Sequence, residues 1–323
     1  MAPPLHPVDQ LSDEELRNLL LRVDSAGFPA KLPDVWRAER VRFRETLRRV
    51  PPAKQGNERL LDLGSSRAWL PFYQLVLGYR RIVLNTSYPD SGFVREGTLV
   101  AGADPCDVRV SVFDVERQRF PHEDESFDVV LCLEVLEHLA IDPMAMIAEV
   151  NRVLKLGGRF ILTTPNAVRV SNVVNMILGE HPYGWSAYNG HDGNRHNREY
   201  TPGEVGRLLE AGGFNPAEVS TFGTKSRGPG RDLLRKMCEW ALLPVRRCPR
   251  SWRRDVILAG GRKTSTQIVR RPGWLYFDMA ERKHLREPRE TLHDEGSAAT
   301  SGAIEVPQCC HAITAGHGPL AAP

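Results

Sequence analysis

The sequence predicts an α/β fold with a mostly parallel sheet, and residues 126–166 carry most of the evidence. Residues 127–133, FDVVLCL, form a nearly continuous apolar run of strand length, which is typical of a strand buried on both faces. A capped helical pattern spans 142–158, and residues 159–163 are predicted to form a second strand. Strand, helix and strand with short connections make a right-handed crossover unit of an open α/β sheet.

Five further strands and five further helices are predicted from the hydrophobic pattern. The strands are predicted at 59–63, 81–84, 108–113, 217–221 and 256–259. The helices are predicted at 12–27, 33–49, 168–178, 203–211 and 231–247. Two helices begin with a capping-box pattern, in which Ser12 precedes Glu15 and Thr201 precedes Glu204 by three residues.

Composition excludes several classes of protein. With 41% hydrophobic and 26% charged residues, the 323-residue chain has an ordinary globular composition. Its net charge of +3 is nearly neutral for this length, whereas nucleic-acid-binding proteins usually concentrate positive charge on one face or helix. No nucleic-acid partner is therefore expected. The chain also lacks the G-x-G-x-x-G pattern after its first strand, which argues against a nicotinamide dehydrogenase.

Cysteine usage and the N-terminus predict a cytoplasmic protein. The six cysteines contain no paired C-x-x-C units, so neither a zinc site of that type nor a disulfide framework is expected. The first residues, MAPPLHPVDQ, lack the basic start and apolar core of a secretory signal. No apolar stretch reaches the length that spans a membrane.

The segments FDVVLCLEVLEHL and DPMAMIAEVNRVLKLGGRFILTTPN resemble the fourth and fifth strand region of class I S-adenosylmethionine-dependent methyltransferases. The chain is more narrowly similar to bacterial methyltransferase type 11-like members associated with polysaccharide and other glycan biosynthesis. The resemblance covers about 59–214. It implies a Rossmann-like, seven-stranded, mostly parallel sheet flanked by helices, with an antiparallel final strand and S-adenosyl-L-methionine as cofactor.

The resemblance and the composition together predict three regions. Residues 1–57 are expected to form an N-terminal helical cover, and 58–280 the methyltransferase domain. A lid insert is expected at about 167–200, because long irregular segments in compact domains are usually functional or disordered. The Gly-, Ala-, Ser- and Pro-rich residues 281–323 are expected to be a disordered tail.

Cofactor-binding residues are predicted where the strands end, because ligands of open α/β sheets bind outside the carboxyl ends. The residues that the resemblance places there are Asp62, Gly64, Ser65, Ser66, Asn85, Asp114, Val115, Leu133 and Glu134. This sequence has Ser66 and Ala68 where the family usually has further glycines, and Asn85 where it usually has a carboxylate.

Histidine is the usual general base near neutral pH, and His138, His196 and Glu199 are the catalytic candidates. Two structural alternatives stay open: His138 could hold the start of a helix, and Arg198 could form an ion pair with Glu199. Glu134 and Glu137 are expected to face different ways. No metal site is predicted, since the spacing of His181, His191 and Asp192 matches no ligand pattern.

An acceptor site is expected in the lid, where aromatic side chains could stack on a ring or form a small satellite core. The candidates for substrate binding are Tyr183, Trp185, Tyr188, Arg195, Arg198 and Tyr200. Residues 231–247 carry basic residues around an apolar stripe, so they could contact a membrane surface or pack on the domain.

The principal functional prediction is methyl transfer to an oxygen of a saccharide or glycolipid precursor. One alternative is a small aromatic or quinone-like acceptor. The other is a catalytically silent, methyltransferase-like binding module, suggested by the substitutions in the cofactor-binding turn.

Overall fold

A computed structural model describes residues 5–20, 22, 32–65, 67–87, 106–182, 195–223, 254–265 and 271–276. Several sequence predictions lie outside the described residues: Ser66, Tyr183, Trp185, Tyr188, His191, Asp192, the helix at 231–247 and the tail at 281–323. The chain divides into the units Met1–Leu275 and Tyr276–Pro323, and all helices and strands described belong to the first.

A seven-stranded sheet forms the centre of the first unit, with the order β3-β2-β1-β4-β5-β7-β6. The strands are β1 (Arg59–Leu63), β2 (Arg81–Thr86), β3 (Asp107–Val112), β4 (Phe127–Leu133), β5 (Leu154–Pro165), β6 (Phe214–Phe222) and β7 (Val256–Lys263). The first five strands are parallel, whereas β7 runs antiparallel to both β5 and β6. The predicted Rossmann-like fold with a mostly parallel sheet is confirmed.

Three strands show how well the apolar runs located the sheet. Both β1 and β4 have the predicted bounds. Strand β2 continues through Thr86, two residues beyond the prediction, because it pairs with β3 as far as Val112. Asn85 therefore lies inside a strand, opposite Ser111, and not after the strand's end.

Two of the helices begin where capping residues predict. The helical segments are η1 (Pro7–Gln10), α1 (Asp13–Leu20), α2 (Leu32–Leu47), η2 (Arg67–Trp69), η3 (Phe72–Val76), η4 (Leu136–His138), α3 (Pro143–Val153), α4 (Val170–Ile177) and α5 (Pro202–Ala211). The Asp142 side chain caps α3 by accepting a hydrogen bond from the Met144 amide at 3.0 Å. The expected capping box of Thr201 and Glu204 opens α5. Helix α3 ends before Gly157, because Leu154 is extended and pairs with Phe127 at the start of β4.

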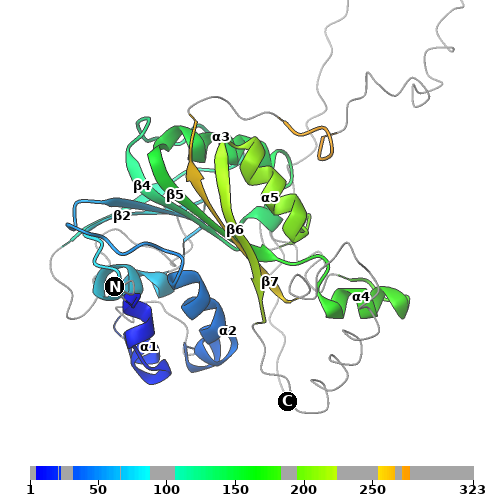
Figure 1. The fold of residues 1–323 in the computed structure, drawn as a ribbon, viewed down its shortest axis with the longest axis horizontal. Helices are drawn as coiled ribbons and strands as arrows, with labels where there is room; N and C mark the ends of the chain where they lie inside the picture. The colour runs from blue at the N-terminus through cyan, green and yellow to red at the C-terminus, as the bar shows by residue number, and fades with distance from the viewer. Residues whose placement is uncertain are drawn as a thin grey trace, which may run out of the picture. The chain divides into compact units, whose positions relative to one another are not determined.

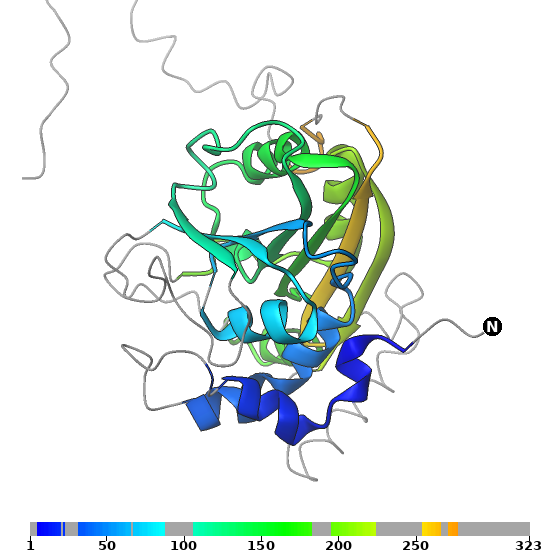
Figure 2. The ribbon, with the colours of Figure 1, turned by 90° about the vertical axis from the view of Figure 1, so that its left-hand side faces the viewer.

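The two faces of the sheet carry different helices (Figures 1 and 2). Alternate side chains of a strand point to opposite faces. On β4, Val129 and Leu131 join the hydrophobic cluster that contains Leu16 of α1 and Phe43 of α2. Cys132 instead contacts Met146 of α3 at 3.8 Å between the sulfur atoms. Helices α1 and α2 thus belong to the same core as one face of the sheet, and α3 covers the other.

Within the described ranges, no helix combines the length and the apolar character that crossing a bilayer requires.

Candidate active site

The site lies at the edge where the parallel strands end. Strand β4 leads directly into Glu134 and the short helix η4, and β5 leads into Asn166. The segment that precedes α5 joins this edge, because the amides of Asn197 and Arg198 donate to the Glu137 carbonyl at 2.7 and 3.2 Å. Residues far apart in the sequence therefore converge where an open α/β sheet binds its ligands.

Gly64 forms the turn after β1 in a conformation that suits glycine. Its φ is +61°, and a Cβ at this position would lie 2.5 Å from Cγ2 of Val135. The Gly64 amide donates to Oδ1 of Asn85 at 3.1 Å, and the Ser65 amide donates to the Asn85 carbonyl at 2.9 Å. The turn is thus held by the neighbouring strand.

Asp62 supports this turn from inside the protein. Its carboxylate accepts hydrogen bonds from the hydroxyls of Ser65, at 2.6 Å, and Tyr73, at 2.9 Å. Burial raises the pKa of Asp62 to about 7, against the lowering effect of these two hydroxyls. Asp62 and Ser65 are both buried, so their side chains shape the turn, and the prediction that they contact the cofactor directly is not supported.

The structure places Asn85, a predicted cofactor-binding residue, inside the protein. Its side chain is fully buried. The amide oxygen accepts from Gly64, and the amide nitrogen donates to the carbonyls of Ser111, at 3.2 Å, and Phe113, at 3.0 Å. Asn85 therefore joins the turn after β1 to the end of β3, because the longer strand β2 draws it into the sheet.

Asp114 and Val115 follow β3, as predicted. Oδ1 of Asp114 accepts from the amides of Glu116, at 2.8 Å, and Arg117, at 3.1 Å, which stabilises a turn. A third of the Asp114 side chain stays exposed, so it can still present an oxygen to a ligand. Val115 is buried and belongs to the hydrophobic core.

Glu134 lies at the centre of the edge, just after Leu133, which is buried. Its φ of +56° is unusual for a residue with a side chain and is typical of functional sites. One carboxylate oxygen pairs with Arg42 of α2 at 3.2 Å. The other oxygen, and Oγ1 of Thr163 on β5, are buried and have no hydrogen-bond partner among the described residues.

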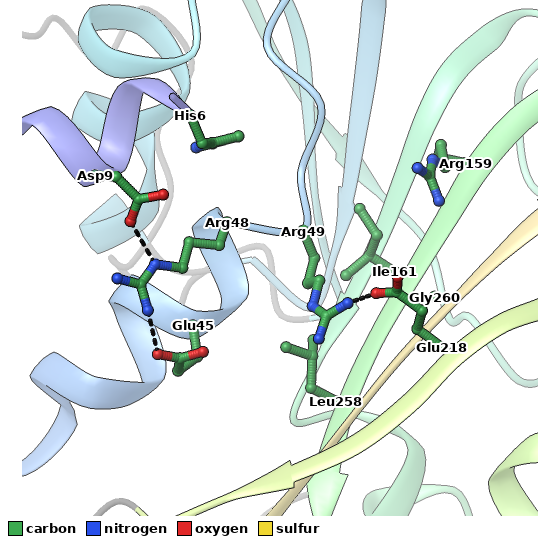
Figure 3. A pocket seen from close by; sticks show the side chains of 10 residues that line it. All are labelled: His6, Asp9, Glu45, Arg48, Arg49, Arg159, Ile161, Glu218, Leu258 and Gly260. Atoms are coloured by element: carbon green, nitrogen blue, oxygen red, sulfur yellow. Dashed lines mark hydrogen bonds and ion pairs between the residues drawn. The ribbon is translucent and has the colours of Figure 1, made fainter. Parts of the chain in front are cut away.

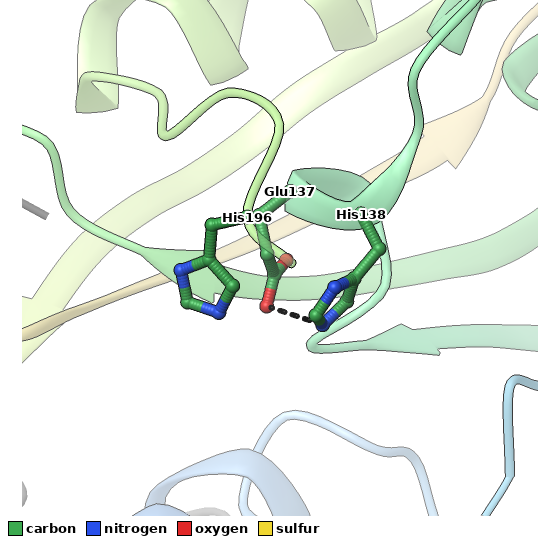
Figure 4. Close-up of side chains that lie close together, drawn as sticks. All are labelled: Glu137, His138 and His196. Atoms are coloured by element: carbon green, nitrogen blue, oxygen red, sulfur yellow. Dashed lines mark ion pairs between the residues drawn. The ribbon is translucent and has the colours of Figure 1, made fainter. Parts of the chain in front are cut away.

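Glu137, His138 and His196 form a cluster beside this edge (Figure 4), with one ligand-type atom from each lying within 4.8 Å of the other two. The two imidazole rings are 5.0 Å apart between centroids. Burial raises the pKa of Glu137 well above its usual value, and the charge of Glu134 raises it further. Burial lowers the pKa of His138, which favours its neutral imidazole.

Glu199 is enclosed and cannot itself reach an acceptor, contrary to its prediction as a base. Its side chain is fully buried and interacts with Nδ1 of His196 at 3.1 Å, with Arg169 at 3.4 Å and with Asn172 at 3.1 Å. The alternative ion pair of Glu199 with Arg198 is wrong as well, because Arg198 pairs with Glu204 at 2.8 Å.

The predicted substrate residues that the structure describes are dispersed. Tyr200 is buried, and Arg198 lies 5.3 Å from the centre of its ring, so Tyr200 is a packing residue and not part of an acceptor clamp. The Arg195 carbonyl meets Nδ1 of His138 at 3.0 Å. A substrate role for the Arg195 and Arg198 side chains stays a prediction.

Glu137, the buried member of the cluster, is not among the predicted site residues. Thr164 donates to its Oε2 at 2.9 Å, and Oε1 lies 3.8 Å from Nε2 of His138. The available signal was a glutamate directly before a histidine in an otherwise apolar turn. Glu134 and Glu137 have different partners, Arg42 and Thr164.

A hollow of about 370 Å³ lies between the N-terminal helices and the sheet (Figure 3). Charged pairs fill much of its wall: Arg48 with Asp9 and Glu45, and Arg49 with Glu218. Arg159, at the amino-terminal part of β5, also lines it. This hollow is therefore remote from the carboxyl ends of the strands and is not the candidate active site.

The sheet order, the glycine turn after β1 and the polar edge define the class of Rossmann-like methyltransferases. A family model described as a methyltransferase domain matches residues 35–219. The chain therefore belongs to the methyltransferase domain family and is an S-adenosyl-L-methionine-dependent methyltransferase.

Curated relatives match only part of the chain. The ubiquinone biosynthesis O-methyltransferase of Idiomarina loihiensis is 34% identical over 29% of this chain and 37% of its own length. The Roseobacter denitrificans protein of the same name is 30% identical over 40% of this chain and 56% of its own length. The chain thus spans about half or less of the length of these relatives.

A solved structure supports the fold. The complex of the Haloferax volcanii Trm112 methyltransferase activator with a methyltransferase aligns with a TM-score of 0.51 and 19% identity. The alignment covers 78% of this chain and 98% of the other.

The described residues fit the cofactor of this family. The Gly64 turn offers a close backbone approach, and Asp114 presents a partly exposed oxygen. Oε1 of Glu134 and Oγ1 of Thr163 are buried polar atoms that lack partners, and such atoms in native proteins usually have a ligand, an ion or water to satisfy them.

Proposed function

We propose that this protein transfers a methyl group to the hydroxyl oxygen of a small aromatic, quinone-like acceptor. The observation that carries the proposal is the cluster of Glu137, His138 and His196 at the carboxyl edge, oriented by the buried Glu199. The names of the relatives support the aromatic acceptor and give no support to the predicted association with glycans.

The acidity of the acceptor also favours an aromatic hydroxyl. A phenol ionises near pH 10, about 3.5 pKa units above an ordinary histidine, so full proton transfer to imidazole costs roughly 5 kcal/mol. An aliphatic sugar hydroxyl is a weaker acid and demands more from the same base. A positioned general base typically contributes about 100-fold to 10,000-fold in rate, which suits the phenolic case better.

Bound S-adenosylmethionine supplies the methyl group on a sulfonium, and displacement by the acceptor oxygen leaves S-adenosylhomocysteine. The protein positions this donor. We assign the Glu134 carboxylate to the cofactor's ammonium group, because one buried oxygen lacks a partner. Asp114 is assigned to the adenine amino group, and the Gly64 turn to the close backbone approach.

The cluster activates the acceptor. His196 is 10% exposed, so one edge of its ring can reach a ligand, while Glu199 holds Nδ1. With Nδ1 facing a carboxylate, the proton of the neutral ring resides there, and Nε2 is the nitrogen that takes the hydroxyl proton. Glu199 is thus a positioning residue, and His196 is the base.

The test compares two acceptor panels, ortho-dihydroxybenzenes and monosaccharides, by mass spectrometry of S-adenosylhomocysteine and of the methylated product. Product is expected with dihydroxybenzenes, and His196→Ala should lower its rate at least about 100-fold. His181→Ala is the matched control, since it removes an exposed imidazole outside the cluster. Product from saccharides alone would overturn the aromatic proposal, and cofactor binding without product from either panel would count against both acceptor classes.

A further inference from the structure

Three side chains at the active-site edge have the chemical types and the spacing of a metal site. Glu137 and His138 come from η4, and His196 comes from the segment before α5, 58 residues beyond His138 along the chain. Each offers one ligand atom within 4.8 Å of the other two, and Figure 4 shows both imidazoles turned toward the carboxylate. Ligand atoms of a tetrahedral ion with bonds of about 2.1 Å lie roughly 3.4 Å apart, so small side-chain rotations would close the cluster.

The contacts behind these side chains orient them as in metal sites. Nδ1 of His138 lies 3.0 Å from the Arg195 carbonyl, and Nδ1 of His196 lies 3.1 Å from Oε1 of Glu199. Both acceptors favour the proton on Nδ1, so Nε2 carries the lone pair that could bind an ion. Metal-bound histidines commonly donate their other ring nitrogen to a carbonyl or carboxylate in this way.

The buried carboxyl of Glu137 also favours a bound cation. Glu137 is 1% exposed, and among the ion pairs of the described residues it meets no lysine or arginine. The imidazole of His138, which is neutral when its pKa is lowered, lies 3.8 Å from Oε1, and Thr164 donates to Oε2 at 2.9 Å. The charge of Arg42 lowers the pKa of Glu137 but does not outweigh its burial. Ionising a buried carboxyl is costly, and a divalent cation bound to it would offset that cost.

We propose that Glu137, His138 and His196 bind one divalent transition-metal ion of the Zn²⁺ or Mn²⁺ type. Two imidazoles and one carboxylate suit such ions better than Mg²⁺ or Ca²⁺, which prefer all-oxygen sites. Three protein ligands leave coordination positions open, as in catalytic and not structural sites.

The use of this ion rests on the proposed function. The open positions would take the acceptor, and they favour an acceptor with two neighbouring oxygens, such as an ortho-dihydroxybenzene. Coordination lowers the pKa of a bound hydroxyl, as it does for metal-bound water. With the ion in place Nε2 of His196 would be a ligand, and the acceptor hydroxyl would release its proton to water instead of to Nε2.

Metal binding is tested without cofactor or acceptor, so the result does not depend on the proposed reaction. Full-length protein freed of metal by a chelator is titrated with Co²⁺, whose visible absorption reports coordination by the protein, and then with Zn²⁺ in competition. One ion per chain is expected. Glu137→Gln and His196→Ala should each weaken binding at least about 100-fold, exceeding the 10-fold to 100-fold typical of residues that only support a ligand.

His181→Ala is the control and should bind Co²⁺ like the wild type. The absence of a Co²⁺ spectrum in the wild type would overturn the proposal, as would unchanged affinity in both cluster variants. Circular dichroism checks the fold of each variant.

A measurement on the wild type keeps the test valid if a variant does not fold. Diethyl pyrocarbonate modifies accessible imidazole nitrogens, and mass spectrometry locates each modified histidine. Zn²⁺ should protect His138 and His196 and leave the exposed His181 reactive. Equal modification of His138 and His196 with and without Zn²⁺ would contradict the proposal.

Discussion

Nδ1 of His196 lies 3.1 Å from Oε1 of Glu199, whose side chain is fully buried. Arg169, which precedes α4, and Asn172 of α4 interact with the same carboxylate. The orientation of His196 therefore depends on the first turn of α4. A buried carboxylate that fixes an imidazole affects chemistry without touching the substrate. This relationship makes Glu199 the most informative residue to change.

Glu199→Gln should lower kcat about 10-fold to 100-fold, because an amide holds the imidazole proton less firmly than a carboxylate. Steady-state kinetics with a dihydroxybenzene measure the effect, and calorimetry should show unchanged S-adenosylmethionine affinity. Glu204→Gln is the control, since glutamine can still complete the capping box while the ion pair with Arg198 is lost. A normal kcat and pH profile in Glu199→Gln would show that Glu199 does not position His196 for catalysis.

The parallel strands could be predicted because burial on both faces leaves a local signature. The apolar runs at 59–63 and 127–133 needed no knowledge of their neighbours, and both have the predicted bounds. Capping boxes are equally local, so the start of α5 was predictable. The position of Asn85 was not, because β2 lengthens only through its pairing with β3.

The site was less predictable from the sequence, because contacts between distant segments form it. His138, His196 and Glu199 were recognisable as reactive types, but the partner of Glu199 is Arg169, 30 residues away, and not its neighbour Arg198. Glu137 was not recognised, because its partners, the Thr164 hydroxyl and the Asn197 amide, come from segments distant in the sequence. Sequence patterns identify the kinds of side chain, whereas tertiary packing decides which carboxylate is buried.

Gly64→Ala should destabilise the fold by more than about 2 kcal/mol, combining the cost of a positive φ with a steric clash against Val135. Gly78→Ala is the matched control. Gly78 has a φ of +74°, but a Cβ there would meet nothing within 4 Å, so only about 1 to 2 kcal/mol of backbone strain is expected. Urea denaturation measures both variants. Equal losses in the two would show that Val135 yields and that the turn tolerates a side chain.

Asp114→Asn should weaken S-adenosylmethionine binding about 10-fold, the scale of losing a hydrogen bond to a charged acceptor. The asparagine oxygen can still accept from the amides of Glu116 and Arg117, so stability should change little. Asp107→Asn is the control, because Asp107 is exposed and pairs with Arg109, two residues away. Calorimetry reports affinity, and unchanged binding in Asp114→Asn would remove Asp114 from the cofactor site.

His122→Phe should reduce the loss of stability in mild acid. Burial and the charges of Arg59 and Arg152 lower the pKa of His122 to about 4, whereas an unfolded histidine titrates near about 6.5. Between these values the unfolded chain binds a proton that the folded chain does not, so the fold loses stability as pH falls. The contribution is at most about 2 kcal/mol, allowing for the partial exposure of the ring.

Phenylalanine suits this position, because the His122 ring already packs against Phe113 and Phe127 at 5.8 and 5.1 Å between centroids. Urea unfolding at pH 7 and pH 4.5 gives the comparison. An identical loss of unfolding free energy in wild type and His122→Phe would mean that another group is responsible.

Asp62→Asn should reduce a loss of stability that occurs as pH rises, the opposite direction from the loss that His122→Phe reduces. The pKa of Asp62 is raised to about 7, while an unfolded aspartate ionises near about 3.9, so the folded chain binds the extra proton between these values. The fold therefore loses stability as pH rises through this window, by up to roughly 4 kcal/mol. Asparagine keeps an oxygen that can accept from Ser65 and Tyr73 but does not titrate. The free energy of unfolding should thus fall less between pH 5 and pH 8 in Asp62→Asn than in the wild type. A larger fall in Asp62→Asn than in the wild type would show that the ionised carboxylate stabilises the turn after β1.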